Sequence, residues 1–150
     1  MSLYLLLHIL SVVVWVGGMF FAYMALRPVA ATVLEPPQRL TLWAGVFGKF
    51  FPWVWASVAL ILLTGLIMLM KISGAGIPHY VLAMLVLGVV MMLLFAHVFF
   101  APYKKLKRAV SEQNWQAGGA ALGQIRMLIG INLSIGLITI VLVFLGRGLI

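Results

Sequence analysis

The chain has 150 residues, of which 65% are hydrophobic and only 8% charged, with ten Lys or Arg against two acidic residues. Soluble domains carry charge on about a quarter of their residues because most of their surface faces water. This composition excludes an ordinary soluble protein and indicates an integral membrane protein. The absence of cysteine excludes disulfides, thiolate metal sites, iron–sulfur clusters and cysteine nucleophiles.

Four apolar stretches are long enough to cross the ~30 Å hydrocarbon core of a bilayer as helices. In chain order they cover residues 3–26, 52–70, 78–101 and 127–145, and each ends at a basic residue, a glycine or a proline. The sequence therefore predicts an all-α fold. We expect a four-transmembrane-helix bundle that forms one domain over residues 1–150.

The connections after the first and third spans have helical patterns of their own. Residues 36–49 repeat large apolar side chains at helical spacing, which predicts a short helix in the headgroup layer: Leu40, Trp43, Val46 and Phe47. The basic run 104–108 is expected to continue the third helix, and Asn114 to cap a helix that runs into the fourth. These parts would form an extended cytoplasmic hairpin between the third and fourth spans.

The basic residues are unevenly divided between the two sides of this bundle. Only Lys71 and Arg147 lie on the side of the termini. The others follow the first or third span: Arg27, Arg39, Lys49, Lys104, Lys105, Lys107, Arg108 and Arg126. The positive-inside rule then predicts a bacterial inner-membrane protein with both termini in the periplasm. The net charge of +8 is explained by topology, so we expect the lipid bilayer as partner and no nucleic acid.

The spans contain no Asp, Glu, Lys or Arg, which argues against proton-coupled transport through buried carboxylates. The polar candidates at membrane depth include three histidines: His8, His79 and His97. His8 and His97 differ in depth by roughly 13 residues, or ~20 Å along a helix, so they cannot bind one metal ion or one haem iron together.

His8 lies near the outer boundary of the first span, and three further side chains are expected at similar depth: His79, Met68 and Met84. Imidazole and thioether ligands suit copper, and thioether favours Cu(I) because it is soft. The sequence therefore predicts a periplasm-facing copper site. The alternative is that these methionines simply fill irregular apolar gaps.

A second polar layer is expected nearer the cytoplasm, with one side chain from each helix: His97, Asn132, Ser57 and Tyr23. This layer would form either a structural hydrogen-bond network or a second haem or metal site. Trp15 follows His8 by seven residues and shares nearly the same helix face. We expect Trp15 to pack over whatever His8 binds.

The first span contains the pattern H-x6-W-x-G-G, formed by His8, Trp15, Gly17 and Gly18. This segment resembles the opening helix of the copper resistance protein D (CopD) family. Residues 94–108 and 126–133 are also similar to short, stand-alone CopD-like proteins, so the resemblance covers essentially the whole chain. It implies a membrane protein that binds or transports copper ions.

The His-to-Trp spacing is shared with HemJ, the membrane protoporphyrinogen oxidase, whose first-helix histidine is implicated in haem b binding. That distant resemblance implies an alternative, a haem b redox protein with His8, His97 and Trp15 as cofactor-binding candidates. Only this alternative would be an enzyme, and after Trp15 the chain departs from the HemJ pattern. A cofactor-free accessory subunit is the third hypothesis. Four helices are few for a transport path, which favours a homo-oligomer or a membrane partner for copper or electrons.

Overall fold

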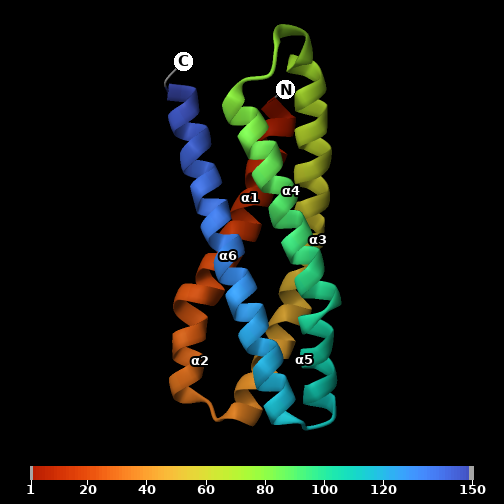
Figure 1. Cartoon of the computed structure of the whole chain (residues 1–150), viewed down its shortest axis with the longest axis vertical. Coiled ribbons are helices and arrows are strands. Elements are labelled where there is room, and N and C mark those ends of the chain that lie inside the picture. Colours follow the sequence, from red (N-terminus) through yellow and green to blue (C-terminus); the bar gives the residue numbers. More distant parts are fainter. Residues whose placement is uncertain (1, 149–150) are drawn as a thin grey trace.

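The computed structural model describes residues 2–148, and every regular element in that range is helical (Figure 1). The elements are α1 (Ser2–Phe21), the π-helical turn η1 (Ala22–Leu26), α2 (Arg27–Val33), α3 (Pro36–Ile72), the 3-10 turn η2 (Ser73–Ala75), α4 (His79–Phe100), α5 (Pro102–Ser111) and α6 (Trp115–Gly148). The all-α prediction is confirmed.

These elements join into four long helical segments, residues 2–33, 36–75, 79–111 and 115–148, each long and apolar enough to cross a membrane. Each predicted span falls inside one of them, except that the third begins one residue earlier, at Pro78. Large apolar side chains cover the outside of the molecule, including Leu93 and Phe144, which are 66% and 77% exposed. Such a surface suits lipid rather than water. The chain is a multi-pass membrane protein.

Two prolines shape the ends of the first and third segments. Pro28 has no N–H to donate, and the turn before it widens to η1, in which the Arg27 N–H donates to the Ala22 carbonyl. Pro102 follows Ala101, whose backbone angles (φ −117°, ψ −86°) leave the helical region. Helix α5, with the basic run, is therefore a separate element rather than a straight continuation of α4.

The predicted short helix over residues 36–49 is wrong as a separate element. Residues 36–72 form the single helix α3, which continues through Pro52. Leu40, Trp43 and Phe47 are 2–5% exposed and pack inside the molecule. Their apolar stripe contacts protein because α5 and α6 lie alongside this half of α3. Hydropathy alone does not distinguish such a stripe from one that faces headgroups.

Helix α1 packs mainly on α3, and α4 packs mainly on α6, while α5 lies against α6 and α3. A cluster of aromatic rings fills the middle of the core: Trp15, Trp43, Phe47, Phe51, Trp55, Phe95, Phe99 and Tyr103. Helix α6 begins after the residue expected to cap it, since the Asn114 side-chain oxygen accepts from the Ala117 N–H at 3.2 Å.

Candidate functional site

The one buried histidine of the described chain is His8, on α1, and it contacts a buried hydroxyl on α3. His8 is 9% exposed and Thr64 is 2% exposed. The Nδ1 atom of His8 lies 3.0 Å from the Oγ1 atom of Thr64. A buried polar group without a partner is costly in hydrocarbon, so this hydrogen bond holds the imidazole in one orientation between the two helices.

The second hydrogen bond of Thr64 determines where the proton on the imidazole lies. The Thr64 hydroxyl donates its single hydrogen to the carbonyl of Leu60, one turn earlier in α3. With its hydrogen on Leu60, the same oxygen accepts from His8, which corresponds to the tautomer with the proton on Nδ1. In that tautomer the lone pair of the neutral imidazole is on Nε2, one of the two nitrogens through which histidine binds metal ions.

The local sequence of α3 allows the ring to approach this closely. Gly65 follows Thr64, and a Cβ atom at that position would lie 3.4 Å from Cε1 of His8. Ser11, three residues further along α1, donates its hydroxyl hydrogen to the Leu7 carbonyl and does not compete for the imidazole. The register of the two antiparallel helices also follows from Tyr4, whose ring lies 4.8 Å from Nζ of Lys71.

Two methionines lie at a height similar to that of His8, one on α3 and one on α4. Met68 follows Thr64 by four residues, which places it one turn further along the same face of α3. Met84 precedes Met91 by seven residues, and so shares the face of α4 that carries this buried side chain. Both Met68 and Met84 are half-buried.

The depth of Met84 follows from a contact of Met91, two helical turns further along α4. Met91 and Val16 approach the same position on α6, since a Cβ atom at Gly136 would lie 3.1 Å from each of their side chains. His8 precedes Val16 by eight residues and Met84 precedes Met91 by seven. Because α1 and α4 run parallel, Met84 and His8 differ in height by only about 1.5 Å.

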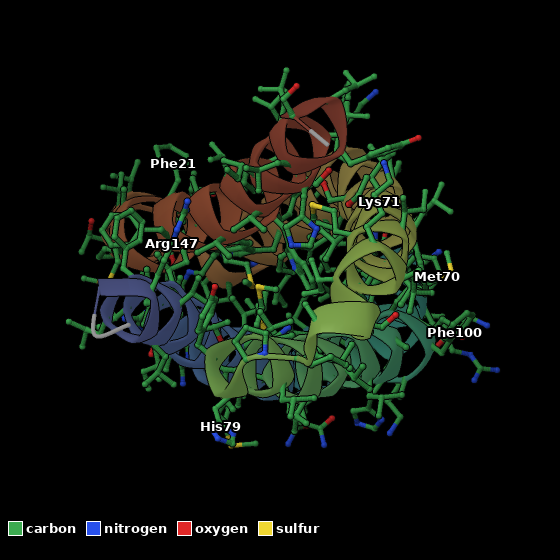
Figure 2. The ribbon with its side chains drawn as sticks, turned by 90° about the horizontal axis from the view of Figure 1, so that it is seen from above. Phe21, Met70, Lys71, His79, Phe100 and Arg147 are labelled. Carbon is green, nitrogen blue, oxygen red and sulfur yellow. The ribbon has the colours of Figure 1, made fainter. Side chains whose placement is uncertain are left out.

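The other predicted ligands lie elsewhere. His79 is exposed at the start of α4, and Figure 2 shows its side chain pointing away from the helices. His97 is exposed on α4. Trp15 is buried and packs edge-on against Phe95, with 6.2 Å between ring centres, so its indole belongs to the aromatic core.

The expected second layer is not joined by hydrogen bonds between its members in the described residues. Asn132 donates to the backbone carbonyl of Met91 at 3.2 Å, which links α6 to α4. Ser57 is buried, and Tyr23 lies under the guanidinium of Arg27, 4.4 Å from the ring centre. The role of Asn132 is thus a helix–helix contact of the kind common in membrane proteins.

The structure provides one buried imidazole that contacts Thr64, with Met68 and Met84 at similar depth on α3 and α4. No three His, Cys, Asp or Glu side chains that could hold a metal ion come together in residues 2–148. Imidazole with thioether is a soft ligand set. Sequence reasoning missed Thr64, although its depth in the second span matches that of His8, because only histidine and methionine were considered at that depth.

The family model of copper resistance protein D, CopD, matches residues 44–145. The matched range contains Thr64, Met68 and Met84 and begins after the helix that carries His8. No curated protein and no solved structure matches the chain significantly. Because the match covers more than half of the sequence, the chain belongs to the CopD family, which is associated with copper resistance.

Proposed function

We propose that this protein handles copper, as Cu(I), at the end of the membrane where the termini lie. The Nε2 atom of His8 would bind the ion, with thioether sulfur from Met68 and Met84. The observation that carries the proposal is the hydrogen bond between His8 and Thr64, because it orients a buried imidazole and, with the proton on Nδ1, would leave the Nε2 lone pair for the ion. An ionisable residue at membrane depth is by default a candidate for function.

Titration of the detergent-purified protein with Cu(I) against a chromogenic chelator tests this proposal. We expect the unmodified chain to bind one Cu(I), His8→Ala to lose it, and Met68→Leu or Met84→Leu to weaken it, because each removes one soft ligand. His97→Ala is the matched control, since it removes a histidine from α4 that is exposed and distant in depth. Equal binding by the unmodified protein and His8→Ala would refute the site.

The visible spectrum of the same preparations decides between copper and the haem alternative. A colourless protein that binds Cu(I) through His8 supports copper. A Soret band that disappears in His8→Ala would instead assign His8 to a haem iron and overturn the copper proposal.

We also propose that both termini face the periplasm. The basis is the placement of the basic residues, since only Lys71 and Arg147 lie at the end of the molecule where η2 and the last turn of α6 are found (Figure 1). The His8 site would then face the periplasmic copper supply.

Reporter fusions test this orientation. Alkaline phosphatase fused after Ile150 is expected to be active, whereas the same reporter inserted at Gln113, in the turn between α5 and α6, is expected to be inactive. Green fluorescent protein at the two positions should give the opposite result. The reverse pattern would place the His8 site on the cytoplasmic side.

A further inference from the structure

A second feature lies at the opposite end of the molecule from His8. A pocket of about 220 Å³ opens between η1 and α2 on one side and the first turns of α3 and α6 on the other. Three guanidinium groups from three different helices line it, together with three aromatic rings: Arg27, Arg39, Arg126, Tyr23, Trp43 and Trp115. The copper proposal uses none of these residues.

The three arginines have no carboxylate to neutralise them. Within residues 2–148 the only side-chain ion pair joins Arg108 to Glu112, on the exposed surface of another helix. Glu35, beside the pocket in sequence, makes no ion pair with Arg27 or Arg39. Three positive charges around one concave space repel each other, and an anion in that space would relieve the repulsion.

Arg39 is already held in place by the backbone. One of its terminal nitrogens donates to the carbonyls of Ala31 and Leu34, at 3.3 and 3.0 Å. Its Nε atom is buried and has no hydrogen-bond partner. A buried donor without an acceptor is costly, so one N–H of the Arg39 guanidinium still lacks an acceptor.

Arg27 is oriented as well, and its position fits the headgroup layer. Its Nε atom donates to the Tyr23 carbonyl at 3.2 Å, and the guanidinium carbon lies over the Tyr23 ring, 4.4 Å from its centre. Arg27 follows the first apolar span directly, and Arg126 precedes the fourth. Both therefore stand at the depth where the phosphates of a bilayer lie.

Apart from the arginines, much of the pocket wall is apolar. Leu40, Phe47, Leu122 and Ile129 line it, with Gly119 and Gly123 on α6, where a Cβ atom would meet nothing within 4 Å. We propose that this pocket, the arginine pocket, binds a phosphate group. Arginine forks match phosphate oxygens in pairs. The apolar walls favour the headgroup of an anionic phospholipid over free phosphate as the source of that group.

Lipid retention tests the proposal. Delipidated protein is given mixed micelles that contain dioleoylphosphatidylglycerol or dioleoylphosphatidylcholine, and bound lipid is counted by native mass spectrometry. We expect one phosphatidylglycerol to be retained, and the affinity to fall at least about tenfold for each arginine removed in Arg27→Gln and Arg39→Gln. Arg108→Gln is the matched control, because it removes an equal charge outside the pocket.

A further variant tests the proposal independently if the arginine variants fold poorly. Gly123→Met retains all three guanidinium groups and fills the pocket from open space on α6, so it should fold and lose the lipid. In a separate arm, sodium phosphate replaces sodium chloride at constant ionic strength. Thermal stabilisation by phosphate without lipid retention would identify free phosphate as the source. Equal lipid retention by all variants, or no effect of either probe, would overturn the arginine pocket.

Discussion

Replacing Thr64 with valine is expected to weaken Cu(I) binding by about 10- to 100-fold, the range seen when the residue that orients a metal-binding histidine is removed. Valine has nearly the shape of threonine but cannot accept the Nδ1 hydrogen of His8. The imidazole would then turn or change tautomer to find another partner, and Nε2 would lose its fixed lone pair. The measurement is the Cu(I) competition titration, made beside the unmodified protein.

Thr64→Ser is the matched control, because it keeps the hydroxyl and removes only a methyl group. We expect it to retain most of the Cu(I) affinity that Thr64→Val loses. The melting temperature of the copper-free protein separates orientation from folding, since a variant that merely unfolds would lose stability before any metal is added. If the Thr64→Val and Thr64→Ser proteins bind Cu(I) equally well, Thr64 does not orient His8 and the tautomer argument fails.

The spans were predictable from sequence because hydrocarbon imposes a simple requirement on length and polarity. What joins them was harder to predict. The sequence predicted a short helix over residues 36–49 and a separate span from residue 52, yet α3 begins at Pro36, where a proline fits the first turn, and passes through Pro52 without ending. The apolar stripe of Leu40, Trp43 and Phe47 has the same sequence pattern whether lipid or protein covers it, so the pattern does not reveal what it contacts.

At the candidate site, sequence predicts depth but not rotation about a helix axis. Depth placed His8, His79 and Met84 near one end of the bundle. Whether a side chain points inward depends on which neighbour each helix packs against. The side chain of His79 points outward (Figure 2), whereas His8 is buried against Thr64. The arginine pocket was equally hidden, because Arg27, Arg39 and Arg126 lie on three different helices and line one pocket only in the folded chain.

Two adjacent glycines on α1 give the second large expected effect. A Cβ atom at Gly18 would overlap the ring of Phe50 on α3, whereas a Cβ atom at Gly17 would meet nothing within 4 Å. Gly18→Leu is therefore expected to lower the free energy of unfolding by about 1–3 kcal/mol, the usual cost of forcing extra atoms into a packed contact. Gly17→Leu faces outward and should leave stability unchanged or raise it by up to about 1 kcal/mol, because leucine favours helix over glycine.

This pair distinguishes close packing from backbone stiffness, because both variants replace glycine by leucine in consecutive positions of one helix. Thermal unfolding in detergent, followed by size-exclusion chromatography, measures the difference. The double variant Gly18→Leu with Phe50→Ala should recover part of the loss, since removing the ring makes room for the new side chain. Because α1 packs chiefly on α3, Gly18→Leu should also disturb the contact between His8 and Thr64 and so weaken Cu(I) binding. Equal stability of Gly17→Leu and Gly18→Leu would show that α1 does not pack on α3 through Gly18.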